Sequence, residues 1–245
     1  MQNRNRSFII HNVNELRNYY NRLFKLEDTK LLQLDSFYIW ISKQLPKTDN
    51  QNLLDVSCGK GRLVYFAKKR GYVAFGVDIS DVALFDMQKT IGESIGILAN
   101  GERLPIANSS FYYVANIGSI EHYISPDEGI KEIARVLKPE GWALILLPNS
   151  YSLLENIWKV IISGDLGDQG QPIERYATIA EWKRILNKNG LKILNILSYN
   201  MPIPLTIKDF FWYLKRPKKL IWLFLSFIVP FNLSGCFLFV CKKDV

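Results

Sequence analysis

Two carboxylates and a run of small residues, each placed at the end of an apolar segment, are the groups best suited to bind a ligand. Asp55 lies in the apolar run 53–56, and Asp78 follows the apolar run 72–77. Residues 57–61, SCGKG, combine small side chains with two glycines, which let the backbone adopt unusual dihedral angles and approach a ligand closely. The pattern predicts a buried strand, a tight turn and the start of a helix, followed by a second strand that carries Asp78.

A glycine-bearing turn at the carboxyl end of a strand is where open α/β sheets bind their ligands. The dinucleotide fingerprint G-x-G-x-x-G requires a third glycine. When Gly59 and Gly61 are aligned with its first two glycines, Val64 occupies the third position, so the dinucleotide pattern is not met. Asp78 at the tip of the next strand is instead well placed to accept hydrogen bonds from the two ribose hydroxyls of an adenosine. A solvated acid at a strand end is the alternative interpretation.

Glu121 and His122 are the candidate acid–base pair, because they follow a strand and turn predicted over residues 114–120. Histidine, with an unperturbed pKa of about 6.5, can accept a proton near neutral pH. Hydrogen bonding at a helix entrance is the alternative role for both residues.

Composition indicates one sizeable α/β domain without a linker, since the chain has 245 residues, of which 48% are hydrophobic and 22% charged. Cys58, Cys236 and Cys241 do not have the spacing of a metal site, and we expect no metal. We interpret the three as free thiols in a reducing cytoplasm. The polar N-terminus, which lacks a signal-peptide core, also predicts a cytoplasmic protein.

Apolar spacing and capping residues define the elements that must position these groups. The expected helices are 12–26, about 30–45, 62–70, one capped by Ser80, about 125–137, 153–162 and 178–189. The expected strands are 53–56, 72–77, the strand and turn 114–120, 143–147, 191–197 and 236–240.

Three segments together resemble a known family. Residues 53–61 resemble the D-x-G-x-G-x-G motif of class I S-adenosylmethionine-dependent methyltransferases, with Ser57 at the first glycine. Residues 99–114, ANGERLPIANSSFYYV, resemble the family segment GDAExLPFxDxSFDxV, and RVLKPEG followed by apolar residues and PN resembles a third. Because the three occur in the family's order over residues 53–149, the chain is similar to methyltransferases of type 11.

The resemblance implies an α/β fold: a Rossmann-like, doubly wound, seven-stranded sheet, mostly parallel with the last strand antiparallel, and helices on both faces. It implies a single methyltransferase domain over residues 1–245. Within it, residues 1–50 would form a helical lid, residues 51–150 the cofactor-binding half, and residues 151–245 the acceptor-side insertion, the last strands and an apolar, basic tail.

The same resemblance implies S-adenosylmethionine as cofactor, S-adenosylhomocysteine as product, and no metal. Asp55 would hold the loop and the amino acid end of the cofactor, Asp78 the ribose. Asn100 stands where the family has an aspartate that binds the adenine amine, and its carbonyl oxygen can still accept that bond. The implied cofactor residues are Asp55, Ser57, Cys58, Gly59, Gly61, Asp78, Ile79, Asn100, Gly101, Glu102, Asn116 and Gly118. The acceptor-side candidates are Tyr19, Tyr20, Arg175 and Tyr176, and a core position is the alternative for the tyrosine pair.

The implied reaction is methyl transfer to an oxygen, nitrogen or carbon of a small-molecule, sugar or lipid-linked acceptor, with His122 and Glu121 as catalytic candidates. An acceptor that is already nucleophilic needs no base, because positioning alone can supply roughly 7–11 kcal/mol of the barrier.

A catalytically degenerate scaffold is one alternative to this function, favoured by Ser57, Asn100 and Tyr112. A nucleic-acid methyltransferase is the other, favoured by the isoelectric point near 9.3. It is disfavoured because residues 148–151 are PNSY, not a target-base motif of the N/D-P-P-Y/F kind.

The tail is the unusual part, because residues 220–241 carry no charge over a length that could cross a bilayer. Pro230 and the polar residues after it predict a turn in the middle of this run, followed by the last strand. Aromatic and basic residues over 208–230 fit a membrane surface, which would place the protein peripherally at the inner membrane face. An ordinary core with solvated charges is the alternative, and the sequence does not predict an oligomeric state.

Overall fold

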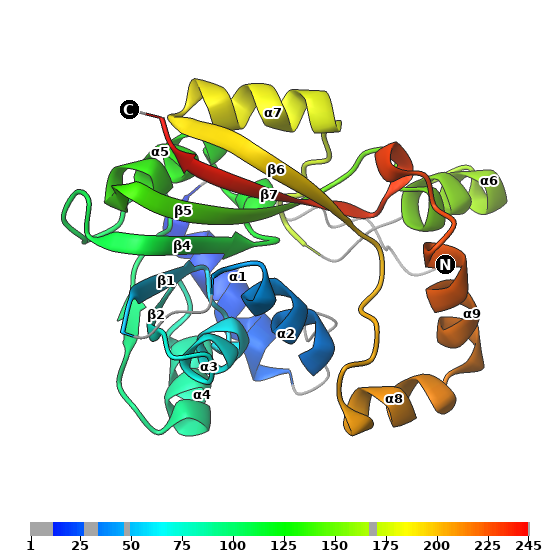
Figure 1. The fold of residues 1–245 in the computed structure, drawn as a ribbon, viewed down its shortest axis with the longest axis horizontal. Coiled ribbons are helices and arrows are strands. Elements are labelled where there is room, and N and C mark those ends of the chain that lie inside the picture. The colour runs from blue at the N-terminus through cyan, green and yellow to red at the C-terminus, as the bar shows by residue number, and fades with distance from the viewer. Residues whose placement is uncertain (1–11, 27–33, 47–49, 167–170, 245) are drawn as a thin grey trace.

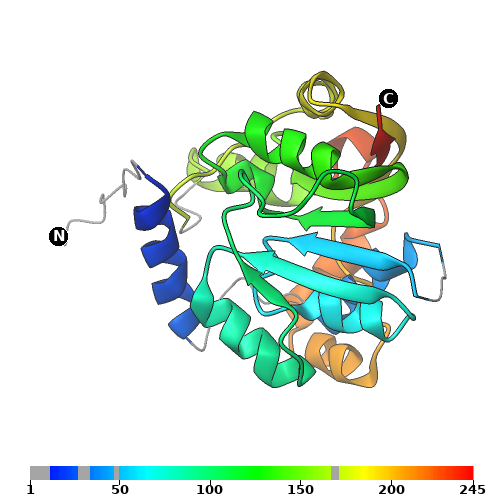
Figure 2. The same cartoon turned by 90° about the vertical axis from the view of Figure 1, so that its left-hand side faces the viewer.

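A seven-stranded sheet forms the centre of the protein, with helices on both of its faces (Figures 1 and 2). The structure is a computed structural model and describes residues 12–26, 34–46, 50–166 and 171–244. The strands are β1 Asn52–Val56, β2 Val73–Asp78, β3 Gly96–Leu98, β4 Phe111–Ile117, β5 Leu137–Pro148, β6 Leu191–Tyr199 and β7 Cys236–Lys243. The helices are α1 Val13–Lys25, α2 Asp35–Lys43, α3 Arg62–Lys68, α4 Asp81–Ile91, α5 Pro126–Val136, α6 Trp158–Ser163, α7 Ile179–Lys188, α8 Ile207–Leu214 and α9 Pro217–Ser226.

The strand order is β3-β2-β1-β4-β5-β7-β6. The pairs among β1 to β5 are parallel, whereas β7 is antiparallel to both β5 and β6. The predicted fold class is therefore confirmed, including the antiparallel last strand. In the register of β1 and β2, Val56 lies opposite Val77, so Asp55 and Asp78 lie near the same carboxyl edge of the sheet.

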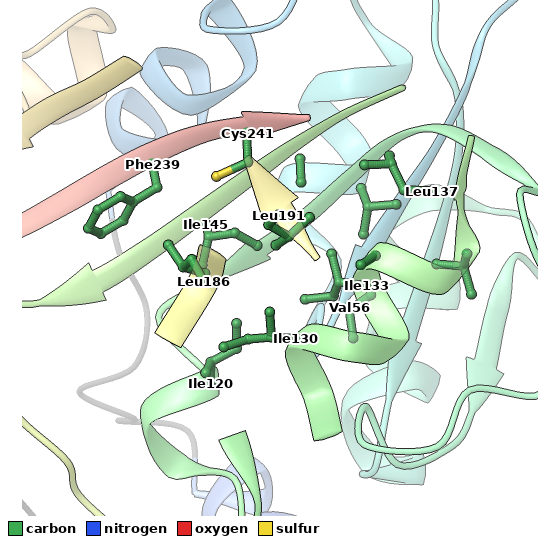
Figure 3. Close-up of a cluster of buried hydrophobic side chains, with 14 of the residues drawn as sticks. Val56, Ile120, Ile130, Ile133, Leu137, Ile145, Leu186, Leu191, Phe239 and Cys241 are labelled. Atoms are coloured by element: carbon green, nitrogen blue, oxygen red, sulfur yellow. The ribbon is translucent and has the colours of Figure 1, made fainter. Parts of the chain in front are cut away.

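Both faces of the sheet are covered, which explains why β1 is apolar at successive positions. Leu54 and Val56 belong to the core under α5 and α7, part of which Figure 3 shows around Ile130 and Ile133. Leu53 belongs to the core on the opposite face, under α2, α3 and α4. Asp55 shares its face with Leu53 but lies where the strand ends at a cavity.

Several predicted boundaries shift. The strand predicted at 143–147 is longer, β5 beginning at Leu137 directly after α5. The helix predicted at 153–162 begins as a π-helical turn, Leu153–Ile157, before α6. The Asn12 and Thr178 side chains cap α1 and α7, each accepting from the backbone amide three residues further on, whereas the Ser125 side chain makes no capping hydrogen bond. The first four residues of the helix predicted at about 30–45 lie outside the described residues.

The uncharged run 220–241 divides as its turn residues predicted. It contributes the end of α9, a 3₁₀ turn at Phe231–Leu233 and most of β7. In the described part of the chain, no helix has the length and apolar character that crossing a membrane requires.

Gly61 begins α3 at φ +70°, and a Cβ there would lie 2.1 Å from Cγ of Met87 in α4. We expect Gly61→Ala to destabilise the fold by about 2–5 kcal/mol, combining left-handed backbone strain with overpacking. Gly92→Ala is the matched control, because Gly92 has φ +79° and no atom of the described residues lies within 4 Å of the place a Cβ would take. It should cost only about 1–2 kcal/mol. Equal losses in urea unfolding would show that Met87 does not restrict this site.

Candidate cofactor and acceptor site

A cavity of about 350 Å³ lies at the carboxyl ends of the central strands. It brings together most of the predicted site residues, although they come from separate segments of the chain. Those that line it are Tyr20, Asp55, Ser57, Cys58, Gly59, Asp78, Ile79, Asn100, Gly101, Gly118, Glu121 and His122. Gly61, Glu102, Asn116, Tyr19, Arg175 and Tyr176 do not belong to its lining.

Two hydrogen bonds hold the turn after β1 to the end of β2, and in the first the Cys58 amide donates to the Val77 carbonyl at 2.9 Å. The Gly59 amide donates to Oδ2 of Asp78 at 2.7 Å, and the Ser80 amide donates to Oδ1 at 2.8 Å. Gly59 has φ +53° and Ser57 has φ +63°, so Ser57 adopts the left-handed conformation that usually favours glycine. An ionised carboxylate has about four acceptor positions. Asp78 therefore retains acceptor capacity for a ligand in the cavity that it lines.

Burial controls the charge of these carboxyls. Desolvation raises the pKa of Asp55, with a further contribution from the negative charge of Asp78, and burial raises the pKa of Asp78 to about 6. Two cations also line the cavity, but Lys60 pairs with Asp86 at 2.8 Å and Arg62 pairs with Asp35 of α2. Ionised Asp78 thus gives the cavity an uncompensated negative charge at neutral pH, which suits a cationic ligand.

Tyr123 organises the site and was not among the predicted residues. Its buried hydroxyl lies 2.8 Å from Oγ of Ser57 and accepts a hydrogen bond from Nδ2 of Asn116 at 3.0 Å. Asn116 also donates to the Val56 carbonyl at 3.1 Å and accepts from the Ile120 amide at 3.2 Å. Asn116 therefore braces the β1 turn from outside the cavity. The sequence held one signal for this role: a tyrosine follows the Glu121–His122 pair directly, and a buried tyrosine hydroxyl needs a hydrogen-bond partner.

Asn100 and Glu102 hydrogen-bond to each other and hold their loop in place. The Glu102 amide donates to Oδ1 of Asn100 at 3.0 Å, and Asn100 Nδ2 donates back to Oε2 of Glu102 at 3.0 Å. The other Glu102 oxygen accepts from the Ser125 amide. Asn100 faces the cavity, whereas Glu102 holds the loop that carries Asn100.

Helix α1 covers the cavity from the side toward which β1 and β2 point (Figure 2). Tyr20 donates from its hydroxyl to Oε1 of Gln171 at 2.9 Å, and burial raises the pKa of Tyr20. Asn21 bonds both Asp81 and Ser80 at the start of α4, at 2.6 Å each. Tyr19 packs edge-on against Tyr20, with ring centroids 5.5 Å apart.

Glu121 and His122 form a neutral pair at one wall of the cavity. Nδ1 of His122 lies 2.6 Å from the Ile173 carbonyl oxygen, which can only accept, so Nδ1 carries the proton and Nε2 has a free lone pair. Nε2 lies 3.8 Å from Oε1 of Glu121. Burial lowers the pKa of His122 and raises the pKa of Glu121 to about 8. At neutral pH the imidazole can accept a proton and the Glu121 carboxyl can donate one.

The remaining acceptor-side candidates lie behind this wall. Arg175 donates to the backbone carbonyls of Glu121 at 3.4 Å, of Tyr123, and of Ile124 at 3.1 Å. Its guanidinium therefore fixes the segment that carries Glu121 and His122. Burial, followed by nearby acidic groups, raises the pKa of Tyr176.

The cavity also has an apolar end that the sequence did not predict. Its lining includes Phe37 and Tyr38 of α2, Ile117 of β4, Leu146 of β5 and Cys236 of β7. These residues are far apart in the sequence and meet only through the sheet order. In the described part of the chain, no group of three or more His, Cys, Asp or Glu residues is placed to hold a metal ion.

The strand order, the carboxyl-edge cavity and the glycine turn bound to Asp78 define the fold of class I S-adenosylmethionine-dependent methyltransferases. Residues 54–145 of this chain match the family described as a methyltransferase domain.

Relatives and solved structures agree with that assignment. The chain is 25% identical over 149 residues to an uncharacterized methyltransferase of Mycobacterium tuberculosis strain H37Rv, covering 60% of each protein. It is 32% identical over 107 residues to demethylmenaquinone methyltransferase of Chlorobaculum tepidum, covering 43% of this chain and 44% of that relative. The match thus spans less than two thirds of the length of either relative. The methyltransferase in a complex with the Haloferax volcanii Trm112 methyltransferase activator has the same fold, with a TM-score of 0.65 and 16% identity over 96% of this chain and 98% of that chain.

Glu121→Gln tests the buried neutral carboxyl. Below pH about 4.5 Glu121 is protonated whether the chain is folded or unfolded. Between pH about 4.5 and about 8 the unfolded chain releases this proton while the folded chain keeps it, so the free energy of unfolding falls as pH rises. Glutamine stays neutral. We therefore expect the variant to melt several degrees above the wild type at pH 8, at about 2–4 °C per kcal/mol, and close to it near pH 4.5. Glu140→Gln, at an exposed carboxyl, should follow the wild type, and a Glu121→Gln profile parallel to the wild type would contradict the assignment.

The tautomer of His122 is a second expectation. The chain has only two histidines, His11 and His122, so nitrogen-detected NMR can assign both with one His122→Asn variant. We expect His122 to titrate below 6.5 and to carry its proton on Nδ1 at pH 7, because burial disfavours the cation and Ile173 accepts from Nδ1. A protonated Nε2 with a free Nδ1 would rule out the arrangement described above.

Proposed function

We propose that the chain binds S-adenosylmethionine in this cavity and transfers its methyl group to a small-molecule, sugar or lipid-linked acceptor. The observation that carries the proposal is the convergence of Asp55, Asp78 and the positive-φ turn on one cavity. S-adenosylmethionine supplies an electrophilic methyl group on a sulfonium, and S-adenosylhomocysteine remains as the product.

The residues present fit this cofactor. Asp78 has acceptor capacity left for the ribose hydroxyls, and Asn100 faces the cavity where an adenine amine would donate. The backbone of residues 57–61 and the Asp55 carboxyl would border the amino acid end, and the negative charge of the site would attract the sulfonium. Ser57 adopts the left-handed conformation that usually favours glycine, which favours a functional turn over a degenerate one.

The acceptor would enter the end of the cavity between α2, β5 and β7. Phe37, Tyr38 and Leu146 give that end an apolar wall, which favours an acceptor with an apolar portion. The relative from Chlorobaculum tepidum, a demethylmenaquinone methyltransferase, is consistent with this class. His122 would accept the proton from an acceptor hydroxyl or amine through Nε2, and Glu121 would donate a hydrogen bond to the acceptor.

We propose that the three parts of the chain have the roles that the resemblance implies. Residues 1–50 contribute the lid, residues 51–150 bind the cofactor, and residues 151–245 complete the acceptor side. We place the reaction in the cytoplasm, where the free thiols Cys58, Cys236 and Cys241 would stay reduced.

Asp78→Ala is the direct test of cofactor binding. Losing a charged acceptor of two ribose hydroxyls should weaken S-adenosylmethionine binding at least about tenfold, or 1.4 kcal/mol, by calorimetry. Wild-type affinity should also fall as pH drops below about 6, where Asp78 takes up a proton.

The matched control for this test is Asp127→Ala, which removes a carboxylate of α5 outside the cavity and should bind as the wild type does. An unchanged affinity of Asp78→Ala would refute the ribose role. Formation of S-adenosylhomocysteine with an acceptor extract, and its loss in Asp78→Ala, would separate an enzyme from a cofactor-binding scaffold.

A further inference from the structure

An exposed apolar surface extends over α6, α8, α9 and the segment 227–231, on the right of Figure 1. Trp158 of α6 and Trp222 of α9 are in edge-to-face contact, with ring centroids 6.0 Å apart, and α8 packs against α9. The most exposed side chains include Ile161, Ile162, Ile207, Phe224, Phe227 and Ile228, and Ile207 and Ile228 are 79% and 77% exposed. Soluble proteins rarely leave apolar side chains of this size grouped on one surface without a partner.

Basic residues accompany these apolar ones. Residues 207–231 contain five basic side chains, Lys208, Lys215, Arg216, Lys218 and Lys219, and one acid, Asp209. Asp209 is buried and accepts from the Ser36 amide at 2.7 Å, and five basic side chains against this one acid leave the segment a net charge of +4. In the described part of the chain, none of the five basic side chains forms a salt bridge.

Three of the basic side chains share a groove of about 450 Å³ between α2 and α8. Lys208, Lys215 and Arg216 line it, and the Arg216 guanidinium lies 4.6 Å from the Trp212 ring centroid. Two acids, Asp35 and Asp209, also line the groove, but the three basic side chains outnumber them and Asp35 is paired with Arg62. The groove is therefore positively charged and has room for an anionic group.

We propose that this apolar–basic face, formed by α6 and residues 207–231, docks the protein on an anionic lipid bilayer. The apolar side chains would enter the boundary of headgroups and acyl chains, while the lysines and Arg216 contact headgroup phosphates. A protein partner fits less well, because lysines are depleted at protein interfaces, whereas here the basic cluster 215–219 lies between two stretches with exposed aromatic residues.

Two connections join the docking face to the acceptor end of the cavity. Asp209 of α8 accepts from both the amide and the hydroxyl of Ser36, at 2.7 and 2.5 Å, and the next residue, Phe37, lines the cavity. At the other side, Phe231 packs on Phe237, with ring centroids 5.5 Å apart, beside the cavity residue Cys236. If the proposed methyl transfer holds, this placement favours an acceptor that is itself embedded in or linked to lipid.

Vesicle sedimentation of the full chain tests the docking directly. We expect binding to vesicles of phosphatidylcholine with one third phosphatidylglycerol, much weaker binding to phosphatidylcholine alone, and release at high salt. Lys218→Gln/Lys219→Gln should lower the partition coefficient on anionic vesicles roughly 20- to 30-fold, from the usual contribution of a basic residue near such a surface. Phe227→Ser/Ile228→Ser, at exposed positions, should remove most binding.

Matched controls come from distant helices. Lys183→Gln/Arg184→Gln removes an adjacent basic pair of α7, and Phe85→Ser removes an exposed aromatic ring of α4. Both should bind anionic vesicles as the wild type does. The proposal is overturned if the wild type does not sediment with anionic vesicles, or if the controls lose binding equally. It is also overturned if the wild type is a dimer that Phe227→Ser/Ile228→Ser dissociates, because the face would then be a self-association surface.

The docking proposal and the proposed reaction can be refuted independently of each other. Vesicle binding requires no cofactor, so Asp78→Ala should sediment like the wild type while it binds S-adenosylmethionine weakly. A wild type that binds the cofactor but not the vesicles would remove the docking proposal alone. A wild type that binds the vesicles but not the cofactor would remove the proposed function alone.

Discussion

The hydrogen bond from the Gly59 amide to the Asp78 carboxylate joins the two strand ends on which the site depends. It holds a turn with three left-handed residues, Ser57, Gly59 and Gly61, against a carboxyl that burial would otherwise neutralise. Each partner stabilises the other, because the backbone amides of Ser80, Gly59 and Ile79 lower the pKa of Asp78 against the larger effect of desolvation. Without this bond only the Cys58 amide would hold the turn to β2, and Asp78 would lose one of the donors that favour its ionised form.

Desolvation is the force that divides the cavity into two chemically different ends. It leaves Asp78 ionised at neutral pH, with a pKa of about 6, but it keeps Glu121 protonated, with a pKa of about 8. The difference follows from the donors: Asp78 accepts from two amides, whereas Oε2 of Glu121 has no partner in the described part of the chain. One end can therefore attract a cation while the other exchanges protons, and Arg175 keeps the second end in place through backbone carbonyls.

Local rules were sufficient for the parts of the site that lie close in sequence. Asp55 and Asp78 were predictable because parallel strands end at one edge, and the Asn12 and Thr178 caps because their partners lie three residues away. Tyr123 was missed because its role depends on contact with Ser57, 66 residues away. The apolar end was missed for the same reason, since Phe37 and Cys236 meet only after β7 inserts between β5 and β6. Periodicity identifies elements, but it does not identify which side chains become neighbours across the sheet.

The insertion of β7 also determines where the tail must lie. Because β7 pairs with both β5 and β6, the chain between the end of β6 and the start of β7 has to leave the sheet and return to it. That excursion is α8 and α9, and its return delivers Cys236 to the cavity and Phe231 to the surface. Asp209, which is buried against Ser36, fixes the first half of the excursion to α2. The buried Asp209 carboxylate thus holds α8 against α2, so the exposed apolar surface of α8 and α9 lies next to a helix that lines the cavity.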